Sequence, residues 1–351
     1  MHPNTTKAID LLKKLIAIPS ISKEESQATS FLYDYIKKEG YLVNRVENNL
    51  WIESSHNKNG NPTLLLNAHV DTVKPTSAWN YDPFFATEEN GKIIGLGSND
   101  DGASLVCLLL TFFSLSQKEQ PYNLIFAISA EEEISGKKGI ELLLNHLPKI
   151  DVALVGEPTQ MNMAIAEKGL MVLDCTAHGK SGHAARNDGE NAIYKALKDI
   201  EWFRTFQFPK QSEILGPVKM TTTIISAGTQ HNVIPDICSF SVDIRSTDTY
   251  SNIEILEIAK QHIESEITPR STRLNSSSID ENHPIVKRGK ELGKTTFGSP
   301  TLSDQALMPF PSLKMGPGDS ARSHSADEYI LIEEISEALS LYFDLLNDLK
   351  I

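Results

Sequence analysis

The chain contains the stretch Leu64-Leu65-Leu66-Asn67-Ala68-His69-Val70-Asp71, in which an apolar run ends in a histidine and an aspartate. The apolar run is typical of a buried strand. His69 and Asp71 lie two residues apart, so their side chains point to the same side of an extended backbone. In such a pair the histidine can bind a metal ion while the carboxylate orients its ring. A polar pair without a metal is the commoner arrangement at a strand end. The case for a metal site therefore depends on the residues that end the other strands.

Two later apolar segments also end in carboxylates. Leu124-Ile125-Phe126-Ala127-Ile128-Ser129 runs into Glu131-Glu132-Glu133, and Val152-Ala153-Leu154-Val155 runs into Gly156-Glu157. A solvated acidic surface is the alternative for residues 131–133, but it is not expected directly after a mostly apolar strand. Open α/β sheets place their sites at the carboxyl ends of their strands. The three segments therefore predict one shared site at the edge of a sheet.

The loop Gly95-Leu96-Gly97-Ser98-Asn99-Asp100-Asp101-Gly102 is rich in glycine and acidic residues. A dinucleotide-binding GxGxxG pattern would need glycine at Asp100, where a carboxylate would repel a pyrophosphate. We interpret the loop as a tight turn that presents Asp100 at the N-terminus of a helix predicted over 103–115. A helix N-terminus favours an ionised carboxylate.

Length and composition narrow the class of protein. The chain has 351 residues, enough for two domains, and its formal charge of −13 argues against binding to nucleic acid. The longest apolar run, 104–115, is shorter than the ~20 residues that span a bilayer. The three cysteines lack CxxC spacing, which argues against a thiolate zinc site or a disulfide framework. We expect a cytoplasmic protein that binds neither nucleic acid nor membrane.

The pattern of predicted elements changes near Lys168. Beyond it, strands and helices follow in the order β-α-β-β-α-β, which fits a ferredoxin-like domain inserted into the first. We therefore predict an α/β domain with a central mixed β-sheet flanked by helices over 1–167 and 280–351, and an inserted α+β domain over 168–279. The strands of the inserted domain are predicted over 170–176, 218–226, 239–245 and 272–277. In the first domain, Ser22 and Glu25 have the spacing of a capping box before a helix.

Five residues are candidate metal ligands: His69, Asp100, Glu133, Glu157 and His324. Carboxylates and imidazoles without a thiolate suit Zn²⁺, Co²⁺ or Mn²⁺ in a catalytic site. Two histidines and three carboxylates are enough for two ions if one carboxylate bridges them.

The motifs resemble those of the dinuclear zinc amidohydrolases, the family that includes acetylornithine deacetylase, succinyl-diaminopimelate desuccinylase and glutamate carboxypeptidase. They cover nearly the whole chain in the family's order and are most similar to an acetylornithine deacetylase-like branch. The matching motifs are NAHVD at 67–71, GLGSND at 95–100, SAEEE at 129–133, GEPT at 156–159, GKSGHAAR at 179–186, GTQHNVIP at 228–235 and SHSADE at 323–328.

The resemblance implies a metallopeptidase-like catalytic domain that holds two Zn²⁺ per subunit, with Co²⁺ or Mn²⁺ able to substitute. His69 and Glu157 would bind one ion, Glu133 and His324 the other, and Asp100 would bridge them. Asp71 would orient His69, and Glu132 would act as the general base. The family also implies a cis peptide bond between Asp100 and Asp101.

The resemblance further implies that the inserted domain is a lid and forms a homodimer. His183 would then stabilise the oxyanion, often in the neighbouring subunit, and Asn232 and Arg245 would contact the substrate. From the residues alone, His183 is equally well read as an ordinary loop histidine and Arg245 as a strand-end salt bridge.

The implied activity is hydrolysis of the Nα-acyl amide of an acylated amino acid. N-acetylornithine or N-acetylcitrulline, in arginine biosynthesis, is the expected substrate. Two alternatives remain within the enzymes: a desuccinylase of N-succinyl-ornithine or N-succinyl-citrulline, and a metal dipeptidase. A silent binding protein is the alternative outside them, but the complete ligand set and Glu132 argue against it. Departures from the family pattern at Leu96 and at Asp101-Gly102-Ala103 leave the substrate open.

Overall fold

The computed structural model describes residues 2–186 and 188–351, which form two compact units. The first unit comprises the chain up to Ile165 together with Ser278–Phe297 and Ser303–Ile351. The second unit comprises Ala166–Ser277 and Gly298–Leu302. Among the described residues, no helix combines the length and the apolar content that a membrane span requires.

The first unit is built on a mixed sheet with the strand order β1-β2-β6-β3-β7-β17-β8-β15, and β16 pairs with β8. The strands β6, β3, β7 and β17 at its centre are parallel, and the pairs at β2 and β8 are antiparallel. The mixed α/β sheet predicted from the sequence is therefore confirmed. Its strands are β1 (Asn44–Val46), β2 (Asn49–Glu53), β3 (Thr63–His69), β6 (Asn123–Ser129), β7 (Val152–Val155), β8 (Met163–Glu167), β15 (Ser277–Ser278), β16 (Thr296–Ser299) and β17 (Ser312–Lys314).

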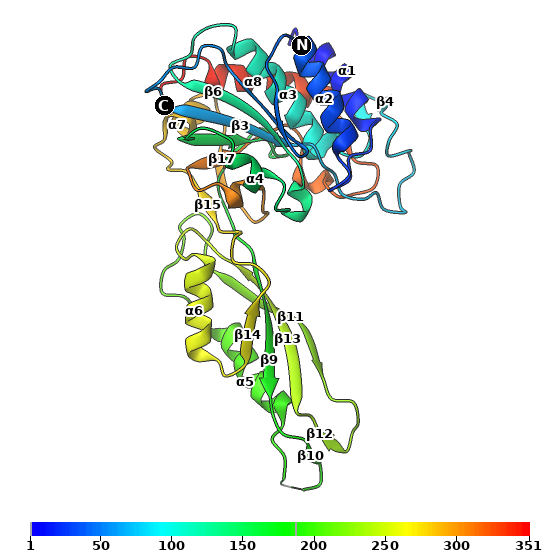
Figure 1. The fold of residues 1–351 in the computed structure, drawn as a ribbon, viewed down its shortest axis with the longest axis vertical. Helices are drawn as coiled ribbons and strands as arrows, with labels where there is room; N and C mark the ends of the chain where they lie inside the picture. Colours follow the sequence, from blue (N-terminus) through cyan, green and yellow to red (C-terminus); the bar gives the residue numbers. More distant parts are fainter. Residues whose placement is uncertain (1, 187) are drawn as a thin grey trace. The chain divides into compact units, whose positions relative to one another are not determined.

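Strand β3 is buried along its whole length because helices cover both faces of the sheet. Leu64 and Leu66 pack in a core cluster with side chains of α1, α3 and α8, whereas Leu65 packs in a second cluster with α4. This two-sided burial explains the unbroken apolar run (Figure 1). The helices of this unit are α1 (Thr5–Ile16), α2 (Ser26–Lys38), α3 (Ala103–Leu115), α4 (Ile140–Leu144), α7 (Pro284–Glu291) and α8 (Ile332–Leu346).

A small antiparallel sheet joins two loops that are far apart in the sequence. Its order is β18-β5-β4, from Tyr329–Leu331, Lys92–Ile94 and Thr87–Glu89. Tyr329 pairs with Ile94. The pairing brings the loop after β5, which carries Asp100, beside the loop before β18, which carries His324.

The second unit has a four-stranded antiparallel sheet in the order β11-β13-β9-β14. With two helices it follows the chain order β-α-β-β-α-β, which is the ferredoxin-like arrangement. Figure 1 labels these elements and the short pair β10–β12. Their bounds are β9 (Met171–His178), β10 (Gly182–His183), α5 (Ala192–Thr205), β11 (Lys219–Ala227), β12 (Val233–Ile234), β13 (Ile237–Arg245), α6 (Asn252–His262) and β14 (Glu266–Pro269).

The last strand of this unit is not where the sequence predicts it. The prediction was a strand over 272–277, but β14 covers Glu266–Pro269. Helix α6 ends at His262, and the chain then re-enters the sheet beside β9 as strand β14. The side chain of Asn252 instead holds the later segment as a loop, because its amide donates to the carbonyl oxygens of Thr272 and Leu274 at 3.4 and 2.7 Å.

Candidate metal centre

Three parallel strands deliver three of the five predicted ligands to one edge of the central sheet. His69 is the last residue of β3 and pairs with Ser129, the last residue of β6. The chain after β6 turns into a short 3-10 segment (Glu132–Ile134) that carries Glu132 and Glu133. Glu157 follows β7 by two residues. The in-register parallel pairing therefore brings His69 close to Glu132 and Glu157, which follow it by 63 and 88 positions.

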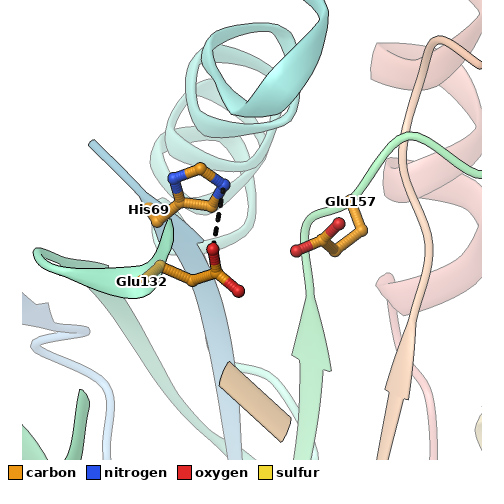
Figure 2. A group of neighbouring side chains, drawn as sticks. All are labelled: His69, Glu132 and Glu157. Atoms are coloured by element: carbon orange, nitrogen blue, oxygen red, sulfur yellow. Dashed lines mark ion pairs between the residues drawn. The ribbon is translucent and has the colours of Figure 1, made fainter. Parts of the chain in front are cut away.

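We call His69, Glu132 and Glu157 the first donor group. One ligand atom of each lies within 4.8 Å of those of the other two. Figure 2 shows the three side chains converging, with His69 Nε2 3.9 Å from Glu132 Oε2. The geometry thus places Glu132, expected to be a base, directly beside His69 and Glu157.

We call His69, Asp100 and Glu133 the second donor group, whose ligand atoms also lie within 4.8 Å of one another. His69 Nε2 is 3.1 Å from Asp100 Oδ1. His324 joins this group, because its Nε2 lies 2.8 Å from Glu133 Oε2 and 3.8 Å from Asp100 Oδ2. His69 therefore belongs to both groups, and Asp100 lies between His69 and His324. The peptide bond between Asp100 and Asp101 is cis, as the sequence predicts.

Asp71 holds the turn that carries the acidic pair. Its carboxylate accepts hydrogen bonds from the backbone N–H groups of Glu132 and Glu133 at 3.0 and 3.2 Å. The Ser22 hydroxyl donates to the same carboxylate at 2.7 Å. The ring of His69 instead donates from Nδ1 to the backbone carbonyl of Asp71 at 2.9 Å, and the carboxylate lies 3.6 Å away.

Burial destabilises the ionised side chains of this site unless cations neutralise them. Burial raises the pKa of Glu132 and of Glu157 well above the usual range, and neighbouring carboxylates raise both further. Burial disfavours the charged form of His69, but hydrogen bonds with Asp100 and Asp71 outweigh it and raise its pKa. Buried carboxylates are stabilised by pairing with cations or by binding metals. The hard oxygen and imidazole donors therefore fit divalent metal ions.

The remaining predicted site residues belong to the second unit. His183 is exposed on β10, and its Nδ1 accepts from the backbone N–H of Ala185 at 3.1 Å. Asn232 is also exposed, and its carbonyl accepts from Ala184 N–H at 3.0 Å, so it lies near His183. Arg245 forms a two-pronged ion pair with Asp243 at 2.8 and 3.2 Å. The roles of these three residues remain predictions.

Two buried carboxylates beside the site were missed in the sequence. Glu328, at the end of the SHSADE motif, accepts hydrogen bonds from the backbone of Asn99 and Asp100. Asp304 accepts hydrogen bonds from Asn67 and Ser129, which lie on β3 and β6. Glu328 ends a polar motif and Asp304 lies between Ser303 and Gln305, so no local pattern marks either carboxylate as buried or identifies its partners.

Two metal-donor groups that share a histidine at the carboxyl ends of parallel strands define a metal-dependent hydrolase. A family model described as peptidase family M20/M25/M40 matches residues 65–348, and the chain belongs to this family. This finding confirms the resemblance carried by the motifs.

Curated relatives match over almost their full length. Succinyl-diaminopimelate desuccinylase of Orientia tsutsugamushi (strain Ikeda) is 26% identical, and the match covers 96% of this chain and 95% of that protein. A probable succinyl-diaminopimelate desuccinylase of Staphylococcus aureus (strain Mu50) is 25% identical, with 95% and 97% covered.

Solved structures share the fold. A tripeptidase from Staphylococcus aureus has a TM-score of 0.77 at 22% identity and covers 98% of both chains. The YXEP protein of Bacillus subtilis, described as a dinuclear metal-binding peptidase of the M20 family, has a TM-score of 0.72 at 18% identity and covers 97% of both chains.

Proposed function

We propose that the protein is a two-zinc amidohydrolase that removes the Nα-acyl group from an acylated amino acid. The observation that carries this proposal is the sharing of His69 between two donor groups, with Glu132 beside it. His69 and Glu157 would hold one ion, Glu133 and His324 the other, and Asp100 would bridge. The nitrogen and oxygen donors suit Zn²⁺, and Co²⁺ or Mn²⁺ would substitute for it.

The ions would supply a water of lowered pKa and polarise the scissile carbonyl. The protein's own contribution is to move a proton and to hold the groups in place. Glu132 takes a proton from the attacking water and delivers it to the leaving amine. Asp71 fixes Glu132 and Glu133 through their backbone N–H groups, so both carboxylates keep their orientation.

Two acyl groups are candidates for the substrate. The motifs favour N-acetylornithine or N-acetylcitrulline, in arginine biosynthesis. The relatives named succinyl-diaminopimelate desuccinylase, 25–26% identical over more than 90% of the chain, favour a succinyl group and would fit lysine biosynthesis. The acylated α-amine is common to both, so the proposal is an N-acyl amino acid hydrolase, with the acetyl group as first choice.

A turnover panel tests this proposal. The full chain, loaded with Zn²⁺ or Co²⁺, is offered acetyl-, succinyl- and formyl-ornithine and -citrulline, succinyl-diaminopimelate and simple dipeptides. Release of acetate or succinate supports the proposal and identifies the acyl group. Cleavage of dipeptides alone would make the protein a dipeptidase, and binding without turnover of any compound would make it a silent binding protein.

The second unit is proposed to be a lid, over about residues 168–279, that forms a homodimer. Its edge strand β11 leaves Ile224 and Ile225 exposed at 57% and 54%, and an unpaired edge favours pairing with another strand. Helix α5, next to β11, exposes Tyr194 and Leu197 on one face. Pairing of two β11 edges would cover these apolar side chains.

Light scattering after gel filtration tests the homodimer. The wild-type protein should have the mass of a dimer, and Ile224→Lys should shift it to a monomer. Ile253→Lys provides a matched control, because Ile253 is 60% exposed on α6 of the same unit. A monomeric wild type, or equal effects of the two substitutions, would refute pairing through β11.

A further inference from the structure

We infer that Glu328 is a positioning residue, which holds Asp100 and His324 in place for the second ion. The inference rests on the proposed two-metal function. Glu328 is 2% exposed and follows His324 by four residues. Its carboxylate is turned towards the backbone of the loop that carries Asp100, and it is not a member of either donor group.

The contacts of the carboxylate define its role. Oε1 accepts hydrogen bonds from the backbone N–H groups of Asn99 and Asp100 at 2.8 and 2.9 Å, and Oε2 accepts one from Gly97 at 3.1 Å. The carbonyl of Glu328 also accepts from Gly95 N–H at 3.0 Å. One side chain thus holds three backbone N–H groups of the turn, those of Gly97, Asn99 and Asp100.

Asn99 connects the same two loops a second time. Its side-chain amide donates to the carbonyl oxygen of Asp319 at 3.1 Å and to the Ser323 hydroxyl at 3.3 Å. Its side-chain oxygen accepts from Asp319 N–H at 3.0 Å. Ser323 precedes His324, so the loop of Asp100 and the loop of His324 are fixed to each other on both sides of these ligands.

Loss of the Glu328 carboxylate would leave buried N–H groups without an acceptor, which destabilises the turn. The turn would then relax and carry Asp100 away from His324. Substitution of a residue that hydrogen-bonds to a metal ligand typically weakens metal affinity by about 10–100-fold. Glu157 follows β7 and lies outside the two loops that Glu328 joins. The affinity for the first ion, which Glu157 would bind, should therefore fall less.

The test measures metal binding in the absence of substrate. Metal-free full-length wild type, Glu328→Gln and Glu328→Ala are titrated with Zn²⁺ by calorimetry and with Co²⁺ by visible absorption. Glu333→Gln is the matched control, because Glu333 is exposed and follows Glu328 by five residues. We expect the affinity for the first ion to change less, because Asp100 is only one of its ligands, and the second ion to bind Glu328→Ala about 10–100-fold more weakly. Glu328→Gln, which keeps one acceptor oxygen, should lie between wild type and Glu328→Ala.

A general loss of stability would weaken the binding of both ions to the same extent, whereas loss of the positioning role weakens the second ion more than the first. Unchanged affinity for both ions in Glu328→Gln and Glu328→Ala would overturn the inference, as would an equal loss of both. If Glu328→Ala does not fold, the affinities of Glu328→Gln for the two ions test the inference by the same criterion. Selective loss of the second ion supports the inference even if the substrate panel finds no turnover, so the two failures are distinguishable.

Discussion

Glu132 and Glu133 are adjacent in the sequence but have different neighbours. Glu133 Oε2 lies 2.8 Å from the His324 ring, whereas Glu132 lies beside His69 and Glu157. Both are presented by the same turn, whose N–H groups are held by Asp71. Each therefore lies in one of the two donor groups, so the ligand role of Glu133 and the base role of Glu132 remain predictions from the family resemblance.

The substitution Glu132→Gln tests this assignment. It keeps the shape of the side chain but removes its ability to accept a proton. We expect kcat to fall by at least ~100-fold, the range for loss of an acid–base group, with metal content unchanged. Glu133→Gln should instead lose metal, as measured by elemental analysis of the purified proteins. If Glu132→Gln loses the metal and Glu133→Gln keeps it, the two roles are exchanged.

At the scale of elements, the ends of β3 and β6 are joined by a side chain from a distant segment. Asp304 accepts a hydrogen bond from Asn67 Nδ2 at 3.0 Å and one from Ser129 Oγ at 2.5 Å. Asn67 and Ser129 lie on neighbouring parallel strands, close to His69. Asp304 therefore holds together the strand ends that carry the site, although it lies far from both in sequence.

Asp304 also makes the stability of the metal-free protein depend on pH. Burial raises the pKa of Asp304 from 3.8 to about 6, although hydrogen bonds from Ser129 and Asn67 lower it in part. Between these values the folded state binds more protons than the unfolded state, so stability falls as pH rises from about 4 to about 6. Asp304→Asn should remove this contribution, which is at most about 3 kcal/mol.

Urea unfolding of both proteins, with a chelator present, measures the effect from pH 4 to 7. The free energy of unfolding of Asp304→Asn should rise relative to wild type as the pH increases. Asp10→Asn, at an exposed position on α1, is the control. A difference that does not change with pH would mean that Asp304 keeps the same charge throughout this range.

The second N-terminal helix shows how tertiary contacts override a local signal. Ser22 and Glu25 have capping-box spacing, yet α2 begins at Ser26 and its start has no side-chain cap. The Ser22 hydroxyl donates to Asp71 instead, and the Glu25 carboxylate accepts from Lys23 N–H and from the Asn48 side chain. The capping prediction was wrong because the helix begins only at Ser26, and the side chains of Ser22 and Glu25 bind other residues.

At the scale of the whole molecule, the site concentrates carboxylates in a chain with a formal charge of −13. Exhaustive removal of metal should abolish hydrolysis, and added Zn²⁺ or Co²⁺ should restore it. Metal should also stabilise the fold, because the ions offset repulsion among buried carboxylates. At a hundredfold excess over Kd, each ion contributes about 2.7 kcal/mol, which thermal unfolding would record as a higher Tm. Full activity in the demetallated protein would refute a metal mechanism.

The proposed homodimer makes a prediction about His183. His183→Ala should lower kcat by ~10²–10³, the typical effect of losing one oxyanion donor, and leave metal content intact. His178→Ala is the control, because His178 is exposed in the same unit. If His183 acts across the dimer, mixing His183→Ala with Glu132→Gln should restore activity, since one site regains both groups. Subunits that exchange without any return of activity would rule out action in trans.

The sequence by itself determined the parallel strands β3, β6 and β7, the site residues that follow them, the βαββαβ order and the family. These features are local, because an apolar run and the residue that ends it are neighbours in the chain. Tertiary structure alone decided the partners of those carboxylates. Asp304 lies 237 residues from Asn67 and Glu328 lies 228 residues from Asp100, so no local pattern records either contact. The position of β14 was likewise decided by pairing with β9, a long-range contact that outweighs local preference.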